Sequence, residues 1–72
     1  MEIHIIDLKT NTRVKFTDCE QFKNINIGHK MSVNYKDEYG NNEYINGTIC
    51  SIEHEIDQYD KSFNYKLNIK IY

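Results

Sequence analysis

The chain contains no proline, no tryptophan and no alanine, and leucine occurs only at Leu8 and Leu67 among its 72 residues. Alanine and leucine are strong helix formers, whereas isoleucine, valine, tyrosine, phenylalanine and threonine fit the pleated surface of a sheet. Isoleucine and tyrosine supply most of the apolar mass of this chain. These absences favour a mainly β fold before any pattern is considered.

Secretion and membrane signals are also missing. No apolar run approaches the roughly 20 residues that cross a bilayer, and the first ten residues lack the basic segment and long apolar core of a signal peptide. We therefore expect a cytoplasmic protein with no membrane partner, in which the glycosylation-like triplet Asn46-Gly47-Thr48 stays unmodified. Cys19 and Cys50 are expected to be reduced and buried, and a disulfide between them is the alternative.

Size and charge narrow the class of function. A chain of 72 residues has room for one domain, residues 1–72, with one small core and little space for an enclosing catalytic cleft. The net charge is −2, and the nine basic residues are scattered rather than gathered into the stripe that usually binds phosphates. Nucleic acid is therefore a less favoured partner than protein. The A/T-rich codons of isoleucine, asparagine, lysine and tyrosine indicate a low-GC bacterium or one of its phages.

Strand-like alternation covers most of the chain. Residues 2–8 and 13–16, joined by a short polar loop, predict a hairpin. Residues 29–36 alternate apolar and polar side chains, and residues 63–72 do so without interruption. In between, a capping box of Thr17 and Glu20 predicts a short helix over Asp18–Ile25.

The segment from Tyr44 to Asp57 changes its alternation phase once. Ile45 and Ile49 fall on one face, whereas Cys50, Ile52, His54 and Ile56 fall on the other. One slip of this kind is typical of a β-bulge, which bends a strand so that a small sheet can close. Gly47 would allow a close approach there. The rival interpretation is a hairpin turn at Asn46-Gly47; we favour the bent strand.

The sequence thus predicts a small antiparallel barrel of four to five strands with one short helix. The apolar side chains in phase on these elements form the expected core: Ile3, Ile5, Val14, Phe16, Phe22, Met31, Val33, Ile49, Ile52, Leu67, Ile69 and Ile71.

The triplet Glu53-His54-Glu55 contains side chains of the kinds that serve in catalytic and metal sites. On a strand the two carboxylates point to one face and the imidazole to the other, so they cannot share a metal or a proton. His4 and His29 are isolated in the sequence, and the histidine and cysteine spacings match no zinc pattern. We expect no catalytic residues, no metal and no cofactor, and instead cross-strand pairs of the glutamates with Lys66 and Lys70.

Residues 28–72 resemble SH3-like small barrels, in particular the Tudor-like kind. In those barrels a glycine precedes an alternating strand, and an aromatic-x-x-Gly-x-Ile strand follows a turn. The matching positions are Gly28, Met31, Val33, Tyr44, Gly47 and Ile49. The resemblance implies a barrel fold and a cage of rings for a methylated side chain, which Tyr35, Tyr39, Tyr44 and Phe63 would supply.

These observations predict a non-enzymatic protein-binding module, such as a phage- or mobile-element-encoded factor that occludes a basic surface of a host protein. Two alternatives remain open. One is a structural or adaptor subunit that assembles through its sheet edges, as a homo-oligomer or within a phage particle. The other is a nucleic-acid-binding SH3-like barrel.

Two loops combine tyrosines, which often anchor interfaces, with acidic residues that attract a basic partner. One of these loops follows the long strand and is approached by Glu53, Glu55, Asp57, Tyr59 and Asp60. We favour the other loop as the partner-binding site, because its tyrosines lie next to a strand junction. Its expected binding residues are Asp37, Glu38, Tyr39, Glu43 and Tyr44.

Overall fold

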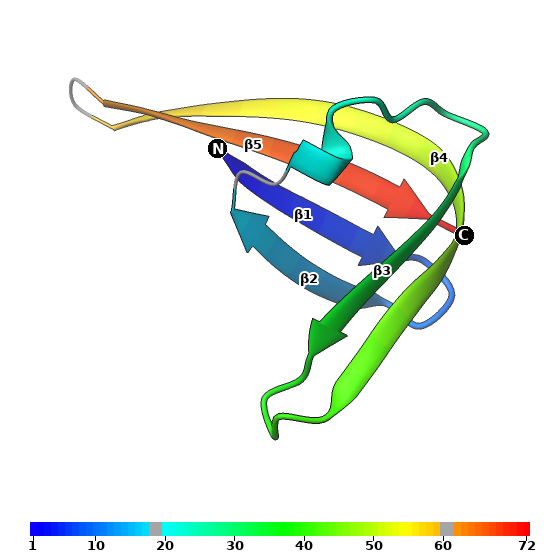
Figure 1. The fold of residues 1–72 in the computed structure, drawn as a ribbon. Coiled ribbons are helices and arrows are strands. Elements are labelled where there is room, and N and C mark those ends of the chain that lie inside the picture. Colours follow the sequence, from blue (N-terminus) through cyan, green and yellow to red (C-terminus); the bar gives the residue numbers. More distant parts are fainter. Residues whose placement is uncertain (18–19, 60–61) are drawn as a thin grey trace.

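The structure is a computed structural model that describes residues 1–17, 20–59 and 62–72 (Figure 1). Its elements are β1 (Glu2–Asp7), β2 (Thr12–Thr17), the 3-10 turn η1 (Glu20–Phe22), β3 (Lys30–Lys36), β4 (Asn42–Tyr59) and β5 (Ser62–Ile71). The strands form one curved sheet in the order β2-β1-β5-β4-β3. This sheet makes a small, nearly closed barrel, which confirms the mainly β prediction.

β4 is one long strand that serves both halves of the barrel. Its first part pairs with β3, and its second part pairs with β5 (Figure 1). Between them Ile49 lies opposite Ile71 and Ser51 opposite Lys70, which leaves Cys50 as the extra residue of a bulge. The predicted bent strand is therefore confirmed, and the alternative hairpin turn at Asn46-Gly47 is wrong.

The bulge also corrects the expectation for Cys50. This cysteine is exposed and free, and its Sγ lies 3.5 Å from the carbonyl oxygen of Thr48. Because the bulge adds one residue, Ile49 before it and Ile52 after it both pack on the core side, and Cys50 is left exposed between them. Cys19, the other cysteine, lies outside the described residues.

The expected antiparallel arrangement is wrong at one pair of strands. Three ladders are antiparallel, but β1 and β5 run parallel, with Ile3 opposite Leu67 and Ile5 opposite Ile69. The reason is topological. Successive strands of this chain alternate in direction, so the first and the fifth point the same way. When a sheet of five such strands curls up and pairs its first strand with its fifth, that pair must be parallel.

Isoleucine dominates the core, as the composition suggested. Val14, Phe16, Met31 and Ile52 were expected inside but are only partly buried against this core. Ile45, which the expected core omitted, is 2% exposed because it shares the inner face with Val33 directly opposite. The buried residues of this core are Ile3, Ile5, Phe22, Val33, Ile45, Ile49, Leu67, Ile69 and Ile71.

The predicted helix over Asp18–Ile25 is wrong, because the described part of that segment forms only the single turn η1, Glu20–Phe22. Asp18 and Cys19 lie outside the described residues. Phe22 is 4% exposed and its ring centroid lies 5.5 Å from that of Phe16 on β2. Docking this ring stabilises more than continuing a short, alanine-free helix, since isolated helices of this length are marginal.

Lys9, in the turn between β1 and β2, contacts β4 and the C-terminal residue Tyr72. Its ammonium donates to the carbonyl oxygen of Asn46 at 2.9 Å and lies 5.8 Å from the ring centroid of Tyr72. Its backbone N–H donates to the buried carboxylate of Asp7 at 3.0 Å. Burial raises the pKa of Asp7, but the Lys9 contacts outweigh it and hold that pKa below the usual range.

Gly47 lies where β4 crosses the end of β5. A Cβ atom built on Gly47 would overlap Cγ2 of Ile71 and would stand 2.8 Å from the carbonyl oxygen of Tyr72. Ile71 is fully buried, and Thr48 and Tyr72 exchange two backbone hydrogen bonds of 3.0 Å beside it. The missing side chain is therefore what lets the two strands approach, as the sequence predicted.

Candidate functional site

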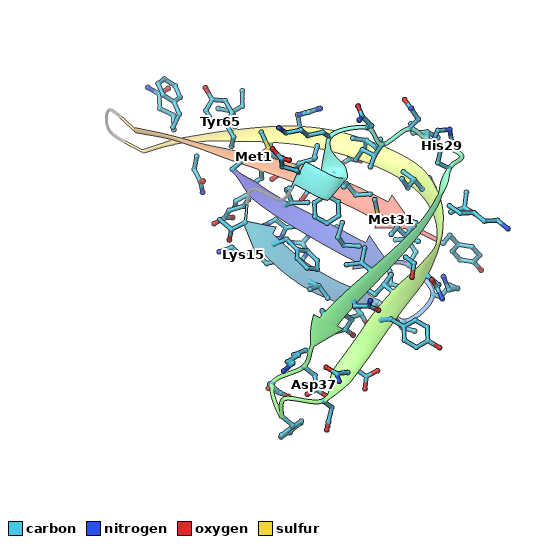
Figure 2. The ribbon with its side chains drawn as sticks, viewed as in Figure 1. Met1, Lys15, His29, Met31, Asp37 and Tyr65 are labelled. Atoms are coloured by element: carbon cyan, nitrogen blue, oxygen red, sulfur yellow. The ribbon has the colours of Figure 1, made fainter. Side chains whose placement is uncertain are left out.

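The predicted partner-binding residues lie together at the end of the β3–β4 hairpin, which we call the β3–β4 tip (residues 35–44). Figure 2 shows Asp37 at the extremity of this hairpin. The turn is closed by backbone bonds from Asp37 N to Asn41 O and from Gly40 N to Asp37 O, both 3.0 Å. Gly40 has a φ of +81°, which a residue without a Cβ adopts at little cost.

The Asp37 side chain stabilises this turn by accepting hydrogen bonds from the backbone of the turn itself. Its Oδ1 accepts hydrogen bonds from the backbone N–H of Tyr39 at 2.9 Å and from the backbone N–H of Asn41 at 2.8 Å. Its Oδ2 lies 3.4 Å from Nδ2, the side-chain amide nitrogen of Asn41. A side chain that bonds the backbone two residues later is the local device that fixes many turns. The structure thus gives Asp37 a structural role, and a contact of its carboxylate with a partner stays a prediction.

Replacing Asp37 with alanine is expected to destabilise the fold by about 1–2 kcal/mol, because two backbone donors lose a charged acceptor. Replacing its neighbour Glu38, which is exposed, should change the free energy of unfolding by less than about 0.5 kcal/mol. Urea unfolding of both variants measures the difference. Equal stability of the two would show that the Asp37 carboxylate does not hold the turn.

The two tyrosines of the tip are largely in solvent. The side chains of Tyr39 and Tyr44 are 81% and 66% exposed. Register places Tyr44 opposite Asn34 on the outer face of the hairpin, whereas Glu43 lies opposite Tyr35 on the face that continues the core. The predicted site is therefore one place in the fold, but its residues are divided between two faces.

A shallow hollow of about 510 Å³ lies at the tip. It holds two of the five predicted site residues, Glu43 and Tyr44, and adds Tyr35 from β3. Glu43 lies directly opposite the half-buried Tyr35, so the Cβ atoms of the two residues stand about 5 Å apart on the same face. A carboxylate beside a ring is a combination that suits a cationic side chain. The complete lining is Asn34, Tyr35, Lys36, Asn42, Glu43 and Tyr44.

The cage of four rings implied by the resemblance is not assembled. Phe63 lies opposite Gln58 near the end of the β4–β5 hairpin, whereas Tyr44 lies near the other end of β4. Tyr35 and Tyr44 lie on opposite faces of their hairpin. Only part of the expected ring set can thus meet any one ligand at the tip.

The triplet Glu53-His54-Glu55 is divided between faces, as strand geometry required. Glu55 lies opposite Lys66, and the Lys70 ammonium lies 3.4 Å from Oε1 of Glu53, which confirms the predicted cross-strand pairing. His54 faces the inner side opposite Leu67. In the described residues no three acidic, histidine or cysteine side chains gather as a metal site would need. Asp60 and the side chains of Asp57 and Tyr59 lie outside the description.

At the other hairpin, the sequence indicated acidic residues and a tyrosine but did not identify an exposed row of apolar side chains. We define the β4–β5 arm as residues 56–59 and 62–65, which extend beyond the end of β1 (Figure 1). On its inner face Ile56, Phe63 and Tyr65 are 61%, 57% and 49% exposed. Alternation predicted the shared face, but only the length of β1 decides where the core stops and the exposed row begins.

A hollow of about 320 Å³ lies between η1 with the residues after it and the inner face of β1, β4 and β5, next to the base of the arm. Figure 2 shows Met1 beside η1 and Tyr65 farther out along the arm. The hollow is mostly apolar and is the continuation of the core towards solvent. Its lining residues are Met1, Ile3, Phe22, Lys23, Ile25, Ile52, His54 and Leu67.

No protein-family model, curated protein or solved structure matches this chain. The described residues also include no helix that is long and apolar enough to span a membrane.

Proposed function

We propose that the chain is a non-enzymatic protein-binding module whose β3–β4 tip engages a basic surface of another protein. The observation that carries this proposal is the exposure of Tyr39 and Tyr44, 81% and 66%, on a turn that Asp37 holds in place. A tyrosine ring buries a large area on binding and loses little conformational entropy. Because the turn is already ordered, little further entropy would be lost when a partner binds.

The charges of the tip support a basic partner. Glu38 and Glu43 are exposed beside the tyrosines, and Lys36 is the cationic member of the same hollow. An arginine or lysine of the partner could lie against the Tyr35 ring and reach the Glu43 carboxylate. Exposed carboxylates would also accelerate the encounter with a positive surface, an effect that salt weakens.

We infer further that the barrel is of the SH3-like kind and acts in the cytoplasm, where a factor encoded by a phage or mobile element would occlude a host protein. The bulged β4, the close approach at Gly47 and the strongly curved sheet support the architecture. The parallel β1–β5 ladder departs from the antiparallel pattern expected of it. The proposed binding mode depends on the tip alone and not on this ladder.

Two double variants test the tip. Replacing Tyr39 and Tyr44 with alanine, or Glu38 and Glu43 with lysine, is expected to weaken the partner complex roughly tenfold or more. The first variant removes two interface anchors and the second replaces attraction of a basic surface by repulsion, and a loss of only about 1.4 kcal/mol is already tenfold in Kd. The partner is captured from a lysate of the source cell and identified by mass spectrometry. Its Kd is then measured with purified proteins.

Matched controls lie elsewhere on the surface. Tyr72 is 69% exposed and Glu20 is exposed on η1, so Tyr72→Ala and Glu20→Lys should leave the Kd unchanged. Asp37 is excluded from the test because its loss would disturb the turn itself. Unchanged affinity of both tip variants, with the fold intact, would refute this site.

A structural or adaptor role is the second candidate, and a separate observation favours it. β2 and β3 are the edge strands of the sheet, and β4 lies next to β3 only as far as Thr48. Unpaired strand edges are natural templates for another strand.

A further inference from the structure

The outer face of the sheet carries its charges in rows, one row for each strand. The ammonium nitrogen of Lys15 on β2 lies 3.0 Å from Oε1 of Glu2 on β1. The ammonium nitrogen of Lys70 on β5 lies 3.4 Å from Oε1 of Glu53 on β4. The hydrogen bond from Lys15, followed by that with His4, holds the pKa of Glu2 below its usual range. Across four of the strands the sign of these charges alternates: basic on β2 (Arg13, Lys15), one acidic side chain on β1 (Glu2, which shares its face with His4 and Ile6), basic on β5 (Lys66, Lys70) and acidic on β4 (Glu53, Glu55).

The two strands at the ends of this series have open edges. β2 is the first strand of the sheet, and among residues 1–17, 20–59 and 62–72 it pairs with β1 alone. At the other end, β3 stops pairing with β4 at Thr48, so residues 51–59 of β4 have no neighbouring strand on that side among the described parts of the chain. We call this stretch the free edge of β4. Figure 1 shows it running out along the arm.

The two open edges carry complementary side chains. On β2, Arg13 and Lys15 are exposed on the outer face, while Val14 and Phe16 lie on the inner face. On the free edge of β4, exposed Glu53 and Glu55 lie on the outer face. Its inner face carries Ile52, His54 and Ile56. A strand that continued the charge series beyond β4 would need a basic outer row and an apolar inner row, which is the pattern of β2.

We propose that the β2 edge of one copy of this chain docks against the free edge of β4 in a second copy, so that the sheet continues from one molecule into the next. Arg13 and Lys15 would then face Glu53 and Glu55 on the outer side. Val14 and Phe16 would cover Ile52 and Ile56 on the inner side, where Ile56 is 61% exposed. Backbone hydrogen bonds along the two edges give the contact its register.

The direction of the strands follows from the fold. β2 is antiparallel to β1, β1 is parallel to β5, and β5 is antiparallel to β4, so β2 and β4 run the same way within one chain. A second copy related by translation keeps its inner and outer faces matched and brings its β2 parallel to the free edge of β4. The same interface then repeats at the other end of each copy, which gives an open chain, or a ring if each step also includes a rotation that closes.

The charges also disfavour the symmetric alternatives. If two β4 edges paired about a two-fold axis, Glu53 and Glu55 of one copy would meet those of the other, and like charges opposite each other destabilise a sheet. Two β2 edges would bring Arg13 and Lys15 together in the same way. Only the β2–β4 contact continues the alternation of rows, so the sequence selects against the symmetric pairs. This inference does not depend on the β3–β4 tip.

Charge exchange tests the proposal by sedimentation in low salt over a wide range of protein concentration. The wild-type mass is expected to rise with concentration and to rise less when salt is added. The variant R13E/K15E and the variant E53K/E55K should each associate roughly tenfold more weakly or worse. An equimolar mixture of the two should associate again, because each acidic edge then finds a basic edge.

Stability controls accompany these variants, since they also alter contacts within the chain. The single variants R13E and E55K keep the Lys15–Glu2 and Lys70–Glu53 pairs and should show the same pattern more weakly. Thermal melting of every variant confirms its fold. A wild type that stays monomeric at all concentrations overturns the proposal, and so does a folded mixture that associates no better than its components. Loss of association in tip variants such as Tyr44→Ala would also contradict it.

Discussion

Replacing Gly47 with alanine is expected to destabilise the protein by about 1–3 kcal/mol, the usual cost of forcing an extra group into a packed site. The new Cβ would overlap the fully buried Ile71 side chain and press on the Tyr72 carbonyl oxygen at 2.8 Å, and neither can move freely. A domain of this size has only about 3–5 kcal/mol of stability. The variant should therefore unfold at a much lower urea concentration.

The sign of this effect is informative. Gly47 has no positive φ, so its backbone conformation alone would favour alanine, which loses less entropy on folding. Asn46→Ala is the matched control, because that side chain is exposed on the other face of the same strand, and it should change stability by less than about 0.5 kcal/mol. If Gly47→Ala were as stable as wild type, β4 and the end of β5 would not be in contact.

Replacing Ile69 with alanine is expected to cost about 2–5 kcal/mol, as for other large apolar side chains truncated in a core. Ile69 is fully buried in the middle of the sheet, with Ile5 on one side and Ile52 on the other. Because the cost matches the whole stability of a domain this small, the variant should be largely unfolded at 25 °C. Circular dichroism and amide exchange would measure the loss.

Tyr65→Ala is the matched control for Ile69→Ala. Both residues lie on the same face of β5, but Tyr65 is on the arm and 49% exposed. Its truncation should cost less than about 1 kcal/mol, since little buried area is lost. A comparable loss in the two variants would show that the arm belongs to the core and is not an exposed extension of it.

Local patterns in the sequence predicted most strands and the position of the bend. The phase slip near Ile49 was enough to indicate a bulge, because period-two alternation tolerates no slip without one. The same pattern could not decide that Cys50 is the residue that faces outward. It also could not reveal that Ile5 lies beside Ile69, since alternation tells which face a residue occupies and not which strand becomes its neighbour.

In the candidate site too, local patterns predicted some features, whereas others depend on rotamers, register and strand length. The sequence placed Asp37 to Tyr44 in one loop because tyrosines and acidic residues gather there, and the structure has these residues together at an exposed turn. The role of Asp37 as acceptor for its own turn depends on a side-chain rotamer that composition does not specify. The division of Glu43 and Tyr44 between two faces follows from register, which a one-residue change would reverse. The exposed arm depends on where β1 ends relative to β5.

The most direct test of the proposed binding surface is the amide spectrum of the ¹⁵N-labelled chain during titration with a short arginine-rich peptide in low salt. The proposal predicts that the largest shifts fall within residues 35–44 and that they disappear in the variant Y39A/Y44A. Shifts confined to Glu53 and Glu55, or shifts at the tip that persist without its tyrosines, would contradict the proposed role of the β3–β4 tip.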